Sequence, residues 1–133
     1  MVRILIVDDS MITRLRLHNI LTSNGYDVVG EADNGTTAIR KYKELQPDIT
    51  TLDITMPGMN GIETLKKIRE TDPQACVVII SALNQKLKIL ESIRNGAVNF
   101  ISKPFEDEKV LQILQEMSQS IAENKLGNTN KNR

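Results

Sequence analysis

Short apolar runs alternate with longer stretches of helical periodicity along the chain. Five runs are rich enough in β-branched and other apolar residues to form strands: residues 3–7, 26–32, 49–53, 76–81 and 99–102. Five stretches carry apolar residues at helical spacing: residues 11–24, 36–45, 62–70, 85–95 and 107–121. Strict alternation of strand and helix predicts an α/β fold, with a parallel sheet and helices on both of its faces.

The hydrophobicity of each run predicts where the strand lies in the sheet. The run at 3–7 is mostly apolar, which indicates a strand buried on both faces. Residues 76–81 form the most hydrophobic run and are expected at the centre of the sheet or next to its edge. Residues 26–32 are less apolar, which favours a position near an edge.

The length of 133 residues fits one domain, which we expect to cover residues 1–121. Residues 122–133 contain little that is apolar and are rich in asparagine. We expect them to form a frayed C-terminal tail.

The charge balance and the short apolar runs exclude several classes of protein. Seventeen basic residues balance seventeen acidic ones, which argues against direct binding of nucleic acid. The longest wholly apolar run, residues 76–80, is far shorter than the roughly 18 residues that span a membrane. The N-terminus becomes acidic at Asp8, so we expect no signal peptide and a cytoplasmic location. One cysteine and one histidine exclude a disulfide framework and a Cys/His zinc cluster.

Polar side chains stand at the ends of four of the five predicted strands. Asp8 and Asp9 follow the first strand, Asp53 ends the third, Ser81 ends the fourth and Lys103 follows the fifth. Parallel strands bring their carboxyl ends to one edge of the sheet, where ligands of such folds bind. The predicted site therefore holds three carboxylates, one hydroxyl and one ammonium group.

Three carboxylates in one place repel one another. At ~4 Å and an effective dielectric constant of ~20, each pair costs roughly 4 kcal/mol. Either one carboxyl group is protonated or a cation lies among them, and an all-oxygen ligand set with few protein donors suits Mg²⁺. Ser81 and Lys103 would add a hydroxyl donor and a positive charge. The predicted site thus has the parts that hold a phosphoryl group.

Each of these residues has a simpler explanation when it is taken alone. Asp9 or Ser10 could cap the helix that follows, Asp53 could be an ordinary loop residue, and Lys103 could be a solvated lysine. Five polar residues at the same end of four apolar strands favour the shared site instead. His18 lies within a predicted helix, away from the strand ends, and is expected to be partly exposed and outside the site.

Four segments together resemble the receiver domain of two-component response regulators, over roughly residues 2–121. They read Ile-Val-Asp-Asp-Ser at 6–10, Leu-Asp-Ile-Thr-Met-Pro-Gly-Met-Asn-Gly at 52–61, Ser-Ala at 81–82 and Lys-Pro-Phe at 103–105. The segments at 54–57 and 100–105 look like those of single-domain chemotaxis regulators of the CheY type from Gram-positive bacteria and their relatives.

The resemblance implies a flavodoxin-like fold, with five parallel strands in the order 2-1-3-4-5. It implies that Asp53 accepts a phosphoryl group from a phosphohistidine of a sensor histidine kinase. Mg²⁺ would be bound by Asp9, Asp53 and the backbone carbonyl of Thr55, with Asp8 acting mainly through water. Mn²⁺ is expected to substitute for Mg²⁺.

The resemblance also implies a switch that responds to phosphorylation. Lys103 would pair with one phosphoryl oxygen and Ser81 would donate a hydrogen bond to another. Phe100 matches the aromatic residue that changes rotamer, and the bond from Lys103 to Pro104 would be cis. Two positions depart from the commonest pattern, because Ser81 replaces threonine and Phe100 replaces tyrosine. The hydroxyl and the ring are kept, but the phenolic hydroxyl is absent.

The implied function is that of a monomeric, phospho-accepting signalling protein rather than an enzyme. Its output surface would be formed by the predicted elements at 85–95, 99–102 and 107–121. The expected partner is the flagellar motor switch in chemotaxis, with a phosphatase as a further partner. A phosphorelay intermediate and a receiver fragment of a DNA-binding regulator are the alternatives.

Two other classes of α/β protein do not fit the predicted site. A haloacid-dehalogenase-type phosphatase would need a second aspartate where Thr55 stands. A flavodoxin-like or dinucleotide-binding module would need a glycine-rich or hydroxyl-rich phosphate loop after the first strand, where this chain has Asp-Asp-Ser-Met at 8–11.

Overall fold

The computed structural model describes residues 1–56 and 58–131, with side chains at all of these except 83 and 125–131. The strands are β1 (Arg3–Val7), β2 (Asp27–Ala32), β3 (Ile49–Leu52), β4 (Val77–Ala82) and β5 (Asn99–Lys103). The helices are α1 (Met11–Thr22), α2 (Gly35–Leu45), α3 (Gly61–Thr71), α4 (Lys86–Arg94) and α5 (Asp107–Lys131), with a 3₁₀ turn at Leu83–Gln85 before α4.

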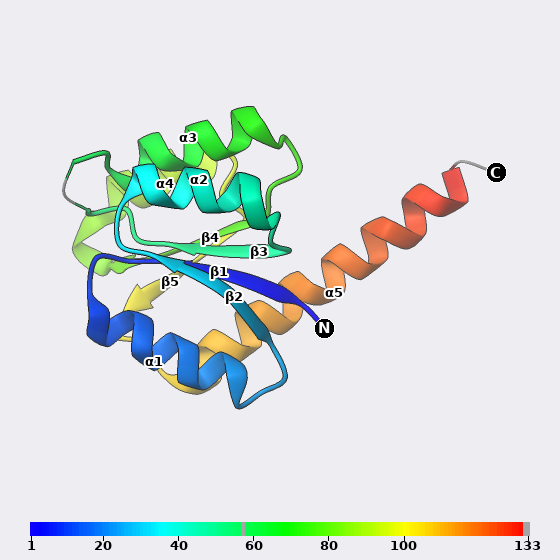
Figure 1. The fold of residues 1–133 in the computed structure, drawn as a ribbon, viewed down its shortest axis with the longest axis horizontal. Coiled ribbons are helices and arrows are strands. Elements are labelled where there is room, and N and C mark those ends of the chain that lie inside the picture. The colour runs from blue at the N-terminus through cyan, green and yellow to red at the C-terminus, as the bar shows by residue number, and fades with distance from the viewer. Residues whose placement is uncertain (57, 132–133) are drawn as a thin grey trace.

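The five strands form one parallel sheet in the order β2-β1-β3-β4-β5. Helices α1 and α5 cover one face of the sheet, and α2, α3 and α4 cover the other (Figure 1). This confirms the predicted doubly wound α/β fold and its strand order. It also confirms that β2 lies at an edge and that β4 lies next to the opposite edge.

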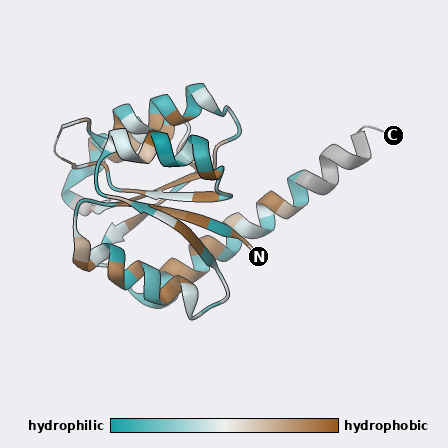
Figure 2. Ribbon diagram, viewed as in Figure 1, coloured by the Kyte–Doolittle hydropathy of each residue, from teal (hydrophilic) through white to brown (hydrophobic). Residues whose placement is uncertain are grey.

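Two apolar clusters, one on each face, hold the sheet between its helices. Side chains alternate along β1, so that Ile4 and Ile6 pack towards α1 and α5 while Leu5 and Val7 pack towards α2 and α3. All four are buried. Strand β1 is mostly apolar, whereas polar residues dominate α2 and α3 (Figure 2). Burial on both faces fixes the register of each strand, because a shift by one residue would exchange the two faces.

Side-chain caps fix the starts of the helices that follow β1, β2 and β3. Ser10, Asn34 and Asn60 each accept a hydrogen bond from the backbone N–H three residues further on. Each cap satisfies a donor that the first turn of a helix leaves unpaired. Ser10 and Asn60 thereby hold the two loops that carry the predicted carboxylates.

The end of α5 differs from the sequence prediction. We predicted a helix that ends near Ile121 and a frayed tail from 122 to 133, but α5 continues to Lys131 and extends away from the sheet (Figure 1). The apolar stripe stops at Ile121, but no proline follows it and the first glycine is Gly127. Beyond the apolar stripe a helix no longer packs against the sheet, but its backbone can remain helical. Residues 132–133 lie outside the described residues, and the domain limit at 121 stays a prediction.

Two further features of the described residues bear on function. Among the described helices, none is both long enough and apolar enough to cross a membrane. His18 is half-exposed on α1, as predicted, and its Nδ1 atom lies 3.4 Å from a carboxylate oxygen of Glu31.

Candidate metal centre

The three predicted carboxylates lie together at the carboxyl edge of the sheet. Asp8 and Asp9 follow β1 and Asp53 follows β3, and these two strands are neighbours. One carboxylate oxygen from each residue lies within 4.8 Å of the others. Asp8 and Asp53 are almost fully buried, whereas Asp9 is exposed. The structure therefore brings the acidic residues together as the strand-end argument predicted.

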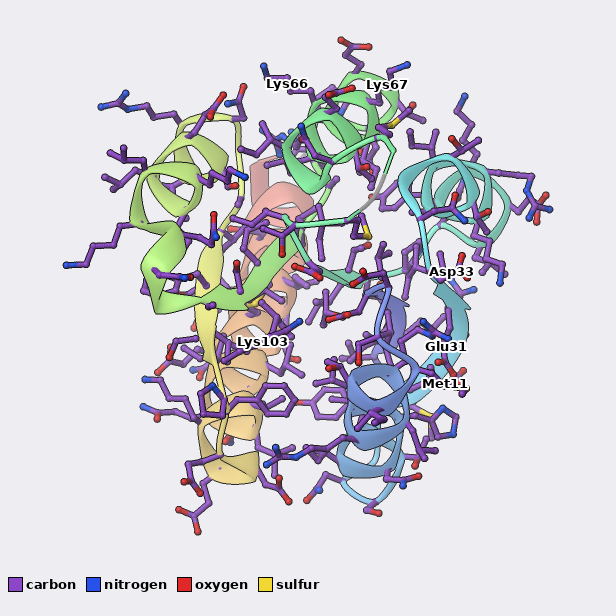
Figure 3. All side chains as sticks on the ribbon, turned by 90° about the vertical axis from the view of Figure 1, so that its left-hand side faces the viewer. Met11, Glu31, Asp33, Lys66, Lys67 and Lys103 are labelled. Carbon is purple, nitrogen blue, oxygen red and sulfur yellow. The ribbon has the colours of Figure 1, made fainter. Side chains whose placement is uncertain are left out.

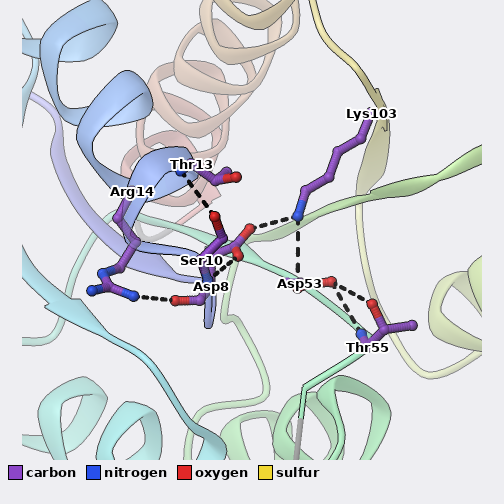
Figure 4. A network of polar contacts seen from close by, with 7 residues as sticks. All are labelled: Asp8, Ser10, Thr13, Arg14, Asp53, Thr55 and Lys103. Atoms are coloured by element: carbon purple, nitrogen blue, oxygen red, sulfur yellow. Dashed lines mark hydrogen bonds and ion pairs between the residues drawn. The ribbon is translucent and has the colours of Figure 1, made fainter.

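Lys103 lies at this edge too, although its strand is not a neighbour of β1 or β3. Figure 3 shows its side chain on β5, and its Nζ atom lies 2.8 Å from Oδ2 of Asp8 and 3.6 Å from Oδ2 of Asp53 (Figure 4). The long side chain reaches past the end of β4. One ammonium group thus faces two buried carboxylates, which leaves the cluster with a net negative charge. The bond from Lys103 to Pro104 is cis, as predicted.

The two carboxylate oxygens of Asp53 have different surroundings. Its Oδ1 atom accepts hydrogen bonds from the backbone N–H and the hydroxyl of Thr55, at 3.0 and 3.1 Å, while its Oδ2 atom faces Lys103. Burial raises the pKa of Asp53 above its ordinary value, and the charge of Asp8 adds to this rise. The hydrogen bonds from Thr55 and the charge of Lys103 oppose it. The surroundings therefore destabilise the ionised form of Asp53, and a cation bound beside it would stabilise that form.

Gly61, the first residue of α3, packs directly against the backbone that carries Asp53. A side-chain carbon at this position would lie 2.3 Å from the carbonyl oxygen of Asp53 and from Cα of Ile54. The N–H of Gly61 donates to the carbonyl of Ile54 at 3.2 Å. Because only glycine permits this approach, the start of α3 sets the position of the Asp53 peptide.

Ser81 is fully buried near the end of β4, and its hydroxyl has no hydrogen-bond partner among the described residues. A buried hydroxyl without a partner costs about 1–3 kcal/mol. Strand order places Ser81 between the strands that carry Asp53 and Lys103. Such a group suits a site in which a ligand supplies the missing acceptor. Phe100 lies on the neighbouring strand β5, opposite Ile79, and is 39% exposed.

Arg14 belongs to the same polar network, although the sequence argument missed it. Its Nη1 atom donates to the backbone carbonyl of Asp8 at 2.7 Å (Figure 4). A signal was present in the sequence. Arg14 lies near the N-terminus of α1, where the helix dipole disfavours a cation and where the first turn carries no acidic residue. An arginine at a position where the helix dipole disfavours positive charge indicates that its guanidinium group has a partner elsewhere in the fold.

The donor set fits a hard divalent cation such as Mg²⁺. Three carboxylates converge from two loops, and one of them, Asp9, is exposed and free to turn towards an ion. Oxygen ligands in small number, with space for water, are what Mg²⁺ prefers. The unpartnered hydroxyl of Ser81 and the ammonium group of Lys103 add the donors that an anionic ligand of such an ion requires.

Asp53→Asn is expected to stabilise the metal-free protein at pH 7. Because the folded-state pKa of Asp53 is raised, its carboxyl group favours folding at low pH, and this contribution is lost as pH rises through that pKa. Thermal unfolding in EDTA should show a Tm higher in Asp53→Asn than in the wild type, by roughly 4 °C for each kcal/mol gained. The difference should shrink as the pH is lowered. A lower Tm in the variant at pH 7 would contradict this electrostatic account.

A buried aspartate beside two further carboxylates and a lysine, at the carboxyl edge of a doubly wound sheet, has the parts of a phospho-accepting site. Residues 4–115 match the model of the response regulator receiver domain, and the chain belongs to this family. The resemblance stated from the sequence is thereby confirmed.

Known relatives agree with this assignment. The chain is 49% identical over 116 residues to the chemotaxis protein CheY of Thermotoga maritima, which covers 87% of this chain and 97% of that protein. It is 47% identical over 112 residues to CheY of Bacillus subtilis, with 84% and 93% covered. Among solved structures, the CheX–CheY–BeF3–Mg²⁺ complex from Borrelia burgdorferi matches with a TM-score of 0.83 and 43% identity, covering 86% of this chain and 87% of that chain. The chain is a receiver of the CheY type.

Proposed function

We propose that Asp53 accepts a phosphoryl group from a phosphohistidine of a sensor histidine kinase, and that Mg²⁺ is required. Asp9, Asp53 and the backbone carbonyl of Thr55 would hold the ion, with Asp8 acting through water, and Mn²⁺ would substitute. The burial of Asp53 beside Lys103 is the observation that carries the proposal. The Mg²⁺ in the Borrelia burgdorferi complex supports the choice of ion. A cytoplasmic location belongs to the same proposal, since the donor is a cellular kinase.

The surroundings of Asp53 favour attack by one of its two oxygens. Thr55 holds Oδ1 by two hydrogen bonds, so that Oδ2 is left to form the new bond to phosphorus. The bond from phosphorus to the histidine nitrogen breaks, and the imidazole leaves with the electron pair. Lys103 lies 3.6 Å from Oδ2, close enough to pair with a transferred phosphoryl oxygen. The ion would supply further positive charge to these oxygens.

The output of this reaction would be a change in the surface formed by α4, β5 and α5. A phosphoryl oxygen offers the hydroxyl of Ser81 the acceptor that it lacks. Movement of Ser81 would open space beside β4, into which the half-exposed ring of Phe100 can turn. Two of these elements carry exposed apolar residues, Leu87 and Leu90 on α4 and Phe100 on β5. The change would be a shift between two populated states of one fold.

The proposed partner of this surface is the flagellar motor switch in chemotaxis, and the similarity to CheY proteins supports it. The chain would act as a monomer without contacting nucleic acid, and a phosphatase would be a second partner. The test is the affinity of the motor switch protein for this chain with and without beryllofluoride and Mg²⁺. We expect at least a 5-fold gain on activation, the lower end of ordinary allosteric coupling. An unchanged affinity, with phosphoryl exchange to a histidine phosphotransfer protein, would favour the phosphorelay alternative.

Phe100→Ala is expected to reduce the gain in partner affinity on activation by about 1–2 kcal/mol, the usual size of an allosteric coupling. The ring acts through packing, because it has no hydroxyl, so Phe100→Tyr should keep most of the gain. Partner affinity is measured with and without beryllofluoride for the wild type and both variants. An undiminished gain in Phe100→Ala would remove the aromatic ring from the switch and leave the loop after Ser81 to carry it.

A further inference from the structure

Arg14 is bonded to the peptide group that joins two of the carboxylate residues. Its Nη1 atom lies 2.7 Å from the carbonyl oxygen of Asp8, the oxygen of the Asp8–Asp9 peptide. The Arg14 side chain is only 17% exposed, so this bond is made away from bulk water. The orientation of this peptide plane sets the direction in which the Asp9 side chain leaves the backbone.

Arg14 is itself anchored to the neighbouring strand. Its Nε atom lies 3.5 Å from Oε1 of Glu31 on β2, and the other carboxylate oxygen of Glu31 lies 3.4 Å from Nδ1 of His18. The guanidinium group thus joins the end of β1, the first turns of α1 and strand β2. A planar guanidinium can serve two acceptors at once because its donors point in fixed directions.

The contact from Arg14 completes the hydrogen bonding of Asp8. The N–H of Asp8 donates to Ala32, and its carboxylate oxygens accept from the N–H of Ser10 and from Lys103. The carbonyl is the remaining polar group, and Arg14 holds it (Figure 4). Asp9, by contrast, is exposed, and its side chain makes no hydrogen bond within the described residues. Its position therefore depends on the fixed peptide before it.

The charge of Arg14 and its position have opposite effects on cation binding. A positive charge near three carboxylates weakens the binding of a cation, although the facing Glu31 offsets much of this charge. A fixed Asp8–Asp9 peptide strengthens binding, because ligand residues that are already oriented need not be ordered when the ion arrives. Removal of Arg14 should therefore strengthen cation binding if its charge has the larger effect, and weaken cation binding if its positioning role has the larger effect.

We propose that Arg14 is a positioning residue of the metal site, which holds the Asp8–Asp9 peptide so that Asp9 can bind the divalent cation. The proposal rests on the proposed function, because it assigns a role toward the ion in that reaction. Glu31 supports Arg14 from β2. The expected result of losing Arg14 is weaker cation binding with little change in the phosphoryl transfer that follows once the ion is bound.

The test compares the wild type with Arg14→Ala, Arg14→Lys and Glu31→Ala. Binding of Mn²⁺ is measured from the electron paramagnetic resonance signal of the free ion, with no phosphodonor present. The Mg²⁺ dependence of labelling by acetyl phosphate then gives an apparent Mg²⁺ constant and a maximal rate. We expect Arg14→Ala to weaken binding of both ions about 10-fold, the lower end for residues that orient metal ligands. The maximal rate at saturating Mg²⁺ should be retained. Arg14→Lys keeps the charge without the planar fork, and Glu31→Ala removes the anchor, so both should show smaller losses.

Arg40→Ala is the matched control, because it removes an exposed arginine paired with Glu44 at 3.9 Å on α2. It should leave Mn²⁺ binding unchanged. Unchanged or tighter binding in Arg14→Ala would overturn the positioning role, and tighter binding would mean that only the charge matters. If Arg14→Ala does not fold, Arg14→Met, which keeps the apolar stem, decides by the same criterion. A wild-type protein that binds no Mn²⁺ would instead overturn the metal site on which the proposal rests.

Discussion

Asp53→Asn is expected to abolish labelling of the protein by acetyl phosphate and by a phosphorylated kinase. The amide cannot form the acyl phosphate, and Asp53 is the buried carboxylate whose second oxygen faces Lys103. The loss should exceed 1,000-fold, since removal of the attacking group removes the reaction itself. Labelling is followed by intact mass or by radioactive phosphate at saturating Mg²⁺.

The fold and the other carboxylates provide the controls for this loss. The metal-free variant should be at least as stable as the wild type, because it lacks the buried charge of Asp53. Loss of labelling in a protein of higher Tm therefore cannot be attributed to unfolding. Label that persists in Asp53→Asn and maps to Asp8, Asp9 or a hydroxyl would show that the acceptor was chosen wrongly.

Much of this site could be predicted because its geometry is set by the backbone. Apolar strands buried on both faces have a fixed register, and parallel strands end at the same edge. A polar residue at or just beyond the end of β1, β3 or β5 is therefore brought to this edge, as Asp8, Asp53 and Lys103 are. The strand order could be predicted as well, because the family that the sequence resembles has the order 2-1-3-4-5.

The parts that sequence reasoning missed depend on side chains and on helix ends. Arg14 reaches the carbonyl of Asp8 from within a helix, and no strand-end rule points to a residue there. The extension of α5 to Lys131 depends on the absence of a stop signal rather than on an apolar face. The sequence correctly predicts Ser81 at the carboxyl edge of the sheet. Only the structure shows that its buried hydroxyl has no hydrogen-bond partner among the described residues.

The acidic cluster and the proposed switch share one feature, which is that polar groups are buried in the metal-free site without full compensation. The metal-free site contains a buried carboxylate with a raised pKa and a buried hydroxyl without an acceptor. In the proposed function a cation would relieve the first and a phosphoryl group the second, so that the free energy of ligand binding would select another conformation. Population shift of this kind requires that the ligand favour one state over the other.

Asp9→Ala is expected to reduce Mg²⁺-dependent labelling by about 100-fold at low millimolar Mg²⁺, the upper end of effects for residues that support a bound metal. Asp9 is the exposed member of the trio and the one not tied to Lys103, so it is the carboxylate that can turn freely to an ion. The measurement is the rate of labelling by acetyl phosphate over a range of Mg²⁺ concentrations. Asp8→Ala should weaken labelling less, because Asp8 is paired with Lys103 and would act through water.

Asp33→Ala is the matched control for this loss, since Asp33 is an exposed carboxylate at the same edge of the sheet that does not belong to the trio (Figure 3). It should leave the Mg²⁺ dependence unchanged. Removal of Asp9 and removal of Arg14 should both shift the Mg²⁺ requirement, but only Asp9→Ala should also lower the rate at saturating Mg²⁺, because a ligand is lost rather than its orientation. Labelling of Asp9→Ala at the wild-type rate in low Mg²⁺ would exclude Asp9 as a ligand and leave Asp8 and Asp53 to hold the ion.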